Sequence, residues 1–245
     1  MSALLTVRDL GVVLGGKQIL DQVSFEVSPG ETLALLGGSG TGKSVTLKTV
    51  LGLLPASAGS IDVGGVDVLK ARDSEAAAAR ARVGMLFQSG ALFDSLSIWE
   101  NISFRLRHAE GVSNKDARAR AEALLDAVGL ETSMAERRPA DLSGGQQKRA
   151  GLARALAAEP EILFFDEPTT GLDPISAGRI DNLMAETIQR TGAAGVMITH
   201  DMASVHKVCQ RVAFIWQGSI GWTGRVEDLD KCDFEPLREF LSGRD

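Results

Sequence analysis

Apolar and polar residues alternate in short runs at the start of the chain. The runs cover residues 4–10, 12–14 and 23–27, and they are broken by Gly15-Gly16 and by the turn at 28–30. In the last run Val23, Phe25 and Val27 alternate with polar residues, which is typical of a half-buried antiparallel strand. The N-terminal region is therefore predicted to form antiparallel β-structure.

A continuous apolar run, residues 32–36, predicts a fully buried strand. A glycine-rich stretch follows it and leads into a helical pattern that we expect to end near Leu54, because Pro55 stops it. Residues 60–63 and 66–68, joined by Gly64-Gly65, predict a hairpin. Residues 75–81 predict a short surface helix, and residues 83–87 a strand that ends at Gln88.

Helical patterns dominate from residue 89 to residue 158. Ser97 and Ser113 each begin a capping-box pattern, and Gly129 ends the helix that follows Ser113. Strand patterns return at 161–166, 195–199 and 211–216. Strands that alternate with helices predict a largely parallel sheet covered on both faces, with functional loops at the carboxyl ends of its strands.

Composition is that of an ordinary soluble globular protein. The 245 residues are 44% hydrophobic and 24% charged, which suffices for one large domain or two smaller ones. A net charge of -6 argues against a nucleic-acid-binding surface. Because the N-terminus lacks a basic segment followed by an apolar core, and no apolar stretch approaches about 20 residues, we expect a cytosolic chain that spans no membrane.

The two cysteines, Cys209 and Cys232, are far apart and fit reduced thiols. His206 and Cys209 share one helix face, but no second pair completes a zinc site, so the spacing favours a packed helix.

Residues 37–44 follow the pattern G-x-x-x-x-G-K-[ST] between the predicted strand and helix. They are Gly37, Gly38, Ser39, Gly40, Thr41, Gly42, Lys43 and Ser44. The glycines let backbone N–H groups converge on a phosphate, and the helix adds its positive end. Lys43 is expected to reach the β- and γ-phosphates and Ser44 to bind Mg²⁺. A chance match to a glycine-rich turn has a probability on the order of 1%.

Two carboxylates, Asp166 and Glu167, directly follow the apolar residues 162–165. A buried strand that ends in acid predicts a cation partner, so Asp166 is assigned to Mg²⁺ and Glu167 to the attacking water as general base. The alternative is a solvated acidic turn, which the phosphate loop makes improbable. Ser143, followed by Gly144 and Gly145, predicts a second anion site at a helix N-terminus.

These motifs together resemble the nucleotide-binding subunit of an ABC ATPase. They are the phosphate loop, Gln88, residues 142–146, Asp166-Glu167, residues 171–173 and His200, in this order. The resemblance covers essentially the whole chain. It implies a single α/β domain of the P-loop NTPase class: a RecA-like core with an antiparallel β subdomain (1–88 and 159–225), an inserted helical subdomain (89–158) and a helical tail (226–245).

The resemblance also implies that two copies pair head to tail around ATP. Lys43 and Ser44 of one copy and the 142–146 segment of the other, through Ser143, Gly145 and Gln146, would then enclose one nucleotide. A single copy would be incomplete.

Further roles follow from the same resemblance. Gln88 would contact Mg²⁺ and the attacking water, with a strand-end cap as the alternative. Asp173 would transmit the state of the site across the dimer, with a helix N-cap as the alternative. His200 would contact the γ-phosphate, with a structural histidine as the alternative. Thr46 belongs to the nucleotide-binding set. Where the family usually stacks an aromatic residue on adenine, this chain, which contains no Tyr, has Leu14 or its neighbours Val12 and Val13. An aliphatic contact is therefore expected in place of ring stacking.

Three stretches are more specific: residues 87–101, 173–178 and 200–202 resemble the Mla-type ATPases that work with MCE-domain proteins in bacterial lipid transport. This implies a peripheral subunit on the cytoplasmic face of the inner membrane. Its implied partners are a multipass permease, an MCE-domain substrate-binding protein and a STAS-domain protein. Leu92 and Phe93 are expected to face the permease; the alternative is that the apolar residues after Gln88 pack inside the helical subdomain. The alternatives are a small-solute importer, a soluble ABC ATPase of DNA repair or translation, and a regulatory module without useful turnover.

Overall fold

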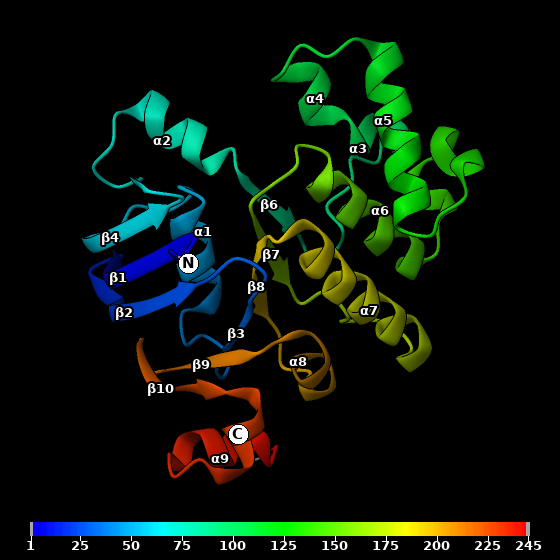
Figure 1. The fold of residues 1–245 in the computed structure, drawn as a ribbon. Coiled ribbons are helices and arrows are strands. Elements are labelled where there is room, and N and C mark those ends of the chain that lie inside the picture. The colour runs from blue at the N-terminus through cyan, green and yellow to red at the C-terminus, as the bar shows by residue number, and fades with distance from the viewer. Residues whose placement is uncertain (1, 244–245) are drawn as a thin grey trace.

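The computed structural model describes residues 2–243, which form two β-sheets with helices around them (Figure 1). An antiparallel sheet has the order β2-β1-β4-β5, and a larger sheet has the order β10-β9-β3-β8-β7-β6, parallel except for β10. The strands are β1 (Leu5–Leu14), β2 (Lys17–Val27), β3 (Thr32–Leu36), β4 (Ala58–Val63), β5 (Val66–Asp67), β6 (Val83–Leu86), β7 (Ile162–Asp166), β8 (Ala194–Ile198), β9 (Arg211–Trp216) and β10 (Ser219–Arg225). The predicted α/β class with an antiparallel N-terminal region is confirmed.

β1 differs from the prediction because it is one long strand and not two. Its pairing with β2 shifts register between Val7 and Leu10 and again before Val12, and Asp9 has a φ of 48°. A bulge of this kind interrupts the alternation of the sequence without ending the strand. β2 also begins six residues earlier than Val23, at Lys17.

The helices follow the predicted caps closely. They are α1 (Lys43–Val50), α2 (Asp73–Arg80), α3 (Ile98–Ile102), α4 (Phe104–His108), α5 (Asn114–Ala127), α6 (Gly144–Leu156), α7 (Pro174–Thr191), α8 (Met202–Val208) and α9 (Glu235–Leu241), with 3-10 helices at Thr132–Glu136, Pro139–Asp141 and Val226–Lys231. Ser97 forms its capping box, and Ser113 accepts a hydrogen bond from the Asp116 N–H. α1 ends at Val50 and not at Leu54, because Gly52 adopts a left-handed conformation with a φ of 75°.

Two hydrophobic clusters lie on opposite faces of the six-stranded sheet. In β3, Leu33 and Leu35 belong to the cluster that also contains α1 and the inner face of the antiparallel sheet, whereas Ala34 and Leu36 belong to the cluster beneath α6, α7 and α8. Alternate side chains of a strand point to opposite faces, so this sheet is buried on both sides. Because both faces of the sheet are covered, a ligand can reach the sheet only at the ends of its strands.

The C-terminal segment docks on the core. Leu237 of α9 is fully buried, and the rings of Phe240 and Phe214 lie with their centroids 5.4 Å apart. Residues 244–245 of the predicted tail lie outside the described residues. Within residues 2–243, no helix combines the length and apolar character needed to cross a membrane.

Candidate functional site

The loop between β3 and α1 is shaped by three glycines. Gly37, Gly40 and Gly42 have φ values of 153°, 74° and 112°, and Gly42 caps the N-terminus of α1. A Cβ at Gly37 would lie 2.6 Å from the carbonyl oxygen of Ile215, and one at Gly42 would lie 2.3 Å from the Leu20 Cδ2. Only glycine fits these positions without displacing a neighbour, so the loop backbone is held where its N–H groups and those of α1 can bind an anion.

The polar side chains of the loop divide into two groups. Lys43 Nζ donates to the carbonyl oxygens of Gly37 and Gly38 at 2.6 and 2.7 Å, and Ser44 is exposed at the loop. Thr46, in contrast, is buried, and its hydroxyl donates to the Gly42 carbonyl at 3.0 Å. The Lys43 amine therefore lies over the loop, whereas the Thr46 side chain is engaged within the first turn of α1.

Asp166 and Glu167 lie at the carboxyl end of β7, two strands from the phosphate loop in the order β3-β8-β7. Burial and the charge of Glu167 raise the pKa of Asp166, while Lys48, Lys148 and Lys43 oppose the shift. A divalent cation bound beside Asp166 would favour its charged form, so the acidic pair and the lysines suit a Mg²⁺-nucleotide.

Glu167 and His200 meet side by side. His200 Nδ1 lies 3.1 Å from Glu167 Oε1, and the Thr170 hydroxyl donates to Glu167 Oε2 at 2.9 Å. The His200 side chain is 70% exposed and that of Glu167 is 18% exposed. The sequence predicted Glu167 and His200 as site residues. It did not predict Thr170, because no motif in the sequence includes that position.

A buried hydroxyl and carboxylate network joins the loop after Glu167 to the start of α8. Ser204 Oγ donates to Asp201 Oδ2 at 3.1 Å and lies 3.3 Å from Thr169 Oγ1. Asp201 is also the N-cap of α8, where its Oδ1 accepts from the Ala203 N–H at 2.9 Å. The loops that carry Glu167 and His200 are thus tied together behind the site.

Asp181 of α7 adjoins this network and gives a stability prediction. The residue is 4% exposed, its Oδ1 has no hydrogen-bond partner, and burial raises its pKa, opposed by Ser204 and Lys207. The folded chain therefore binds this proton more tightly than the unfolded chain, so this contribution to stability is complete below the unfolded pKa and is lost as pH rises through the folded pKa. We expect Asp181→Asn to be about 1 kcal/mol more stable than the wild type at pH 8, with a smaller difference at about pH 4, close to the unfolded pKa of an aspartate.

Urea unfolding of both proteins at the two pH values measures this effect. Asp94→Asn, in an exposed loop, is the matched control. A difference that is equal at pH 4 and pH 8, or a less stable variant at pH 8, would contradict the prediction.

The 142–146 segment begins α6 on the opposite face of the six-stranded sheet from α1 (Figure 1). Ser143 forms a capping box: its N–H donates to Gln146 Oε1 at 2.8 Å, and its hydroxyl accepts from the Gln146 N–H at 3.3 Å. Gly145 lies near Ser176 of α7. One copy of the chain therefore does not bring this segment to its own phosphate loop.

Three other predicted residues have simple local settings. Asp173 is the exposed N-cap of α7, and hydrogen bonds from the Ser176 hydroxyl and from the Ser176 and Ile175 N–H groups hold its pKa below the ordinary value. Gln88 is exposed just after β6, and Leu14 is partly buried against the cluster beneath the antiparallel sheet.

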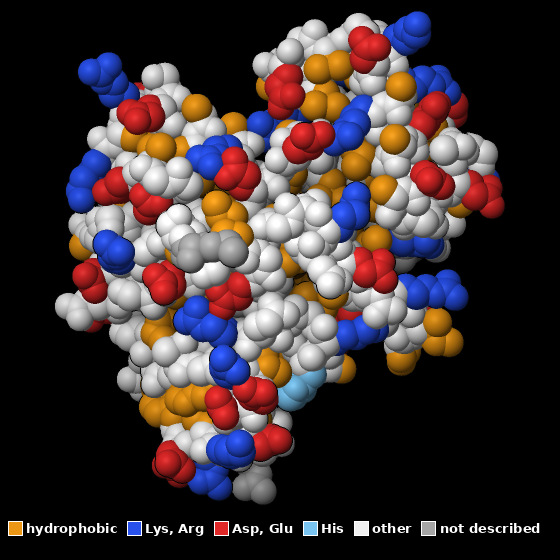
Figure 2. Space-filling view, in the orientation of Figure 1, with side chains coloured by type: hydrophobic (Ala, Val, Ile, Leu, Met, Phe, Trp, Pro, Cys, Tyr) orange, Lys and Arg blue, Asp and Glu red, His pale blue; other side chains and the backbone are white. Residues whose placement is uncertain are grey.

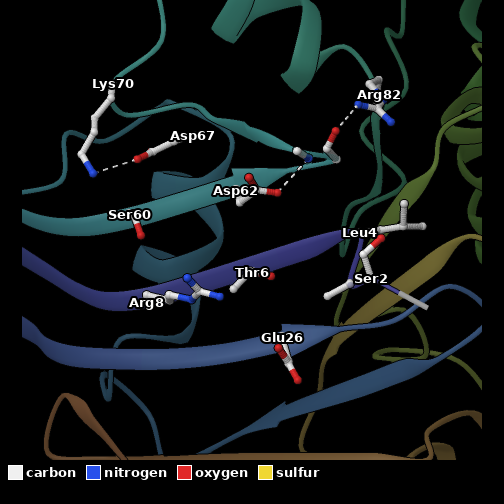
Figure 3. Close-up of a pocket in the computed structure, with 13 residues that line it drawn as sticks. Ser2, Leu4, Thr6, Arg8, Glu26, Ser60, Asp62, Asp67, Lys70 and Arg82 are labelled. Carbon is white, nitrogen blue, oxygen red and sulfur yellow. Dashed lines mark hydrogen bonds and ion pairs between the residues drawn. The ribbon is translucent and has the colours of Figure 1, made fainter.

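A hollow of about 740 Å³ lies elsewhere, on the outer face of the antiparallel sheet (Figure 3). Three of its charged side chains are in ion pairs: Lys70 Nζ lies 3.1 Å from Asp67 Oδ2, and Arg82 forms an ion pair with Glu161. Acidic and basic side chains are interspersed over this side of the molecule (Figure 2). None of the predicted site residues lines the hollow.

A strand-loop-helix phosphate cradle beside an acidic strand end defines the class of P-loop nucleotide hydrolases. Residues 20–170 match the ABC transporter family, and the chain belongs to that family.

Curated relatives span almost the whole chain. The methionine import ATP-binding protein MetN of Carboxydothermus hydrogenoformans is 36% identical over 98% of this chain and 72% of its own length. The probable ribonucleotide transport ATP-binding protein mkl of Mycobacterium leprae is 34% identical over 100% of this chain and 70% of its own. TRIGALACTOSYLDIACYLGLYCEROL 3 of Arabidopsis thaliana, a chloroplastic protein, is 34% identical over 98% of this chain and 74% of its own.

Solved structures agree with the fold. The dimeric ATP-binding cassette MJ0796 with ADP and Pi has a TM-score of 0.80 at 27% identity, covering 91% of this chain and 98% of its own. The cbiO1 protein of Clostridium perfringens, part of the transporter complex cbiONQ, has a TM-score of 0.84 at 26% identity and full coverage of both chains. The chain is an ATP-binding subunit of an ABC transporter that hydrolyses ATP with Mg²⁺, pairs as a dimer and works with a membrane permease.

Proposed function

We propose that this chain drives an ABC transporter that moves phospholipid between the inner and outer membranes of a bacterium. The observation that carries the proposal is the stretch 87–101, together with 173–178 and 200–202, which resemble Mla-type ATPases. The name of the Arabidopsis relative also refers to a glycerolipid. The subunit would act at the cytoplasmic face of the inner membrane, with an MCE-domain protein and a STAS-domain protein as further partners.

A small-solute importer is the second candidate. Its support is the naming of relatives: MetN proteins are named for methionine import, and a Sinorhizobium fredii relative, 36% identical over 93% of this chain, as a probable amino-acid transporter subunit. The nucleotide site has the same chemistry in both candidates, so cargo must be decided by the partners.

The site residues take the following roles in this proposal. Residues 37–44 bind the phosphates, Ser44, Gln88 and Asp166 hold Mg²⁺, and Glu167 activates water with His200 at the γ-phosphate. The 142–146 segment of a second copy closes the site, and Asp173 lies at the contact between copies. The placement of Ser143 away from its own phosphate loop supports this two-copy arrangement.

The loop after Gln88 supplies a surface for the permease. Phe87 and Phe93 are 37% and 41% exposed. The buried Asn101 holds the loop in shape: its Oδ1 accepts from the Phe93 N–H at 2.6 Å, and its amide donates to the carbonyls of Phe93, Leu96 and Ser97. An exposed aromatic ring on a loop with this support suits a docking partner better than solvent.

Purification of the tagged chain from detergent-solubilised membranes of its host, followed by mass spectrometry, tests the proposal. Recovery of a multipass permease with an MCE-domain protein would support lipid transport. Recovery of a solute-importer permease would support the second candidate.

The variant Phe93→Asp tests the docking surface in the same experiment. We expect it to lose at least about 90% of the permease, because a charge would be buried at the contact, while ATP binding stays unchanged. Leu53→Asp is the matched control, since Leu53 is an exposed apolar residue just beyond α1. Equal recovery with Phe93→Asp and the wild type would remove Phe93 from the docking surface.

A further inference from the structure

Lys148 is a buried cation in the second turn of α6. Within residues 2–243, Lys148 is the single lysine or arginine that is buried, and 5% of its surface is exposed. Burial lowers its pKa, whereas the charges of Glu167 and Asp166 raise it. A lysine that is withdrawn from water in this way requires compensation by particular partners.

The partner of Lys148 is the backbone of Glu167. Lys148 Nζ donates to the Glu167 carbonyl oxygen at 3.2 Å, and the Thr170 N–H donates to the same oxygen at 3.3 Å. On the other side of the residue, the Glu167 N–H donates to the Ile198 carbonyl oxygen at 2.8 Å. Both peptide groups of Glu167 are therefore held by other parts of the fold.

Glu167 needs this support because its backbone is strained. Its φ of 46° lies in the left-handed region, which costs a residue with a side chain on the order of 1 kcal/mol or more. That conformation turns the carboxylate toward His200, 3.1 Å away. A loss of support at the carbonyl would let the residue relax toward an ordinary conformation and would move the carboxylate.

The same helix is also fixed to the loop that follows Gln88. Arg154 donates to the Ala91 carbonyl and lies over the Phe93 ring, 4.8 Å from its centroid. A Cβ at Gly151 would lie 2.9 Å from the Gly90 carbonyl oxygen, so the helix and loop are in close backbone contact. α6 thus touches Glu167 near its N-terminal end and the permease-facing loop near its C-terminal end.

From this geometry we infer that Lys148 is a positioning residue for ATP hydrolysis: its ammonium holds the Glu167 backbone and couples α6 to the carboxylate. The inference rests on the proposed role of Glu167 as general base. The first residues of α6 would contact the ATP bound to a second copy. A movement of α6 would therefore shift Lys148, and Lys148 would in turn shift Glu167 of its own copy.

The test is Lys148→Met in the full chain, assayed with its permease complex. Met keeps the unbranched apolar stem and removes the donor. We expect kcat to fall about 10-fold or more, KM for MgATP to stay within about twofold, and Tm not to fall, because replacing a buried charge by an apolar side chain is often neutral or stabilising. Lys148→Arg, which retains a cationic donor, should recover at least about a third of the wild-type kcat.

Lys207→Met is the matched control. Lys207 also donates from Nζ to a backbone carbonyl, that of Gly178 at 2.7 Å, but it joins α8 to α7 away from Glu167. Its kcat should stay within about twofold of the wild type. A wild-type kcat for Lys148→Met, or a fall that accompanies a lower Tm and is not recovered by Lys148→Arg, would overturn the inference.

The variant Glu167→Gln distinguishes a failure of the inference about Lys148 from a failure of the proposed role of Glu167 as general base. If Glu167→Gln is inactive while Lys148→Met is as active as the wild type, only the role of Lys148 fails. If Glu167→Gln hydrolyses ATP at the wild-type rate, the proposed role of Glu167 fails first.

Discussion

Glu167→Gln is expected to lower kcat for ATP hydrolysis by about 100-fold or more, the contribution typical of a positioned general base. Gln has nearly the same shape and still accepts the hydrogen bond of the Thr170 hydroxyl, which lies 2.9 Å from Glu167 Oε2. It cannot take a proton from water. ATP binding should therefore survive, and two copies should still pair when ATP is added because the nucleotide is not consumed.

Steady-state turnover and size-exclusion chromatography with and without ATP measure the two parts of this result. Glu161→Gln is the matched control, because Glu161 directly precedes β7 at the end opposite Glu167 and pairs with Arg82. Turnover that persists in Glu167→Gln would remove Glu167 from its proposed role. Loss of ATP binding together with turnover would instead assign the carboxylate to nucleotide or Mg²⁺ binding.

Lys43→Ala is expected to weaken ATP binding by about 10- to 100-fold, equivalent to about 1.4 to 2.8 kcal/mol. In the structure the ammonium lies over the loop, 2.6 and 2.7 Å from the carbonyl oxygens of Gly37 and Gly38. A triphosphate brought to the loop meets this charge directly, and alanine removes it while leaving the glycine backbone in place.

Titration with a fluorescent ATP analogue measures the affinity. Lys115→Ala, an exposed lysine of α5, controls for the change in net charge. An affinity for Lys43→Ala within twofold of the wild type would show that the backbone donors and the helix N-terminus suffice for binding.

Local sequence signals predicted the elements around the site because each depends on neighbours in the chain. The run 32–36 and the glycines after it specify β3, its loop and α1 without reference to the rest of the fold. Ser97 and Ser143 form their predicted caps for the same reason. Boundaries were less accurate: Pro55 sets only a limit for α1, and the left-handed turn at Gly52 ends it earlier.

Features that depend on distant parts of the chain were not predicted. Lys148 and Asp181 are polar residues of amphipathic helices, where charge usually indicates a solvated face, yet both are buried. A signal was present for Lys148: it lies on the same helix face as Leu152 and Ala155, four and seven residues later, both buried. The contact between Glu167 and His200 joins the ends of two strands, so it became visible only with the sheet order.

The position of β3 between β8 and β9 has a consequence for synthesis on the ribosome. Thr32 pairs with Gly195 of β8 and Leu33 with Arg211 of β9. The ribosome must therefore add roughly 175 residues after β3 before both neighbouring strands have been synthesised. At 5–20 residues per second the delay is roughly 10–35 s. The apolar strand β3 therefore lacks its partner strands for most of translation. We expect chaperones to bind most strongly to nascent chains that are stalled before β9 has been synthesised.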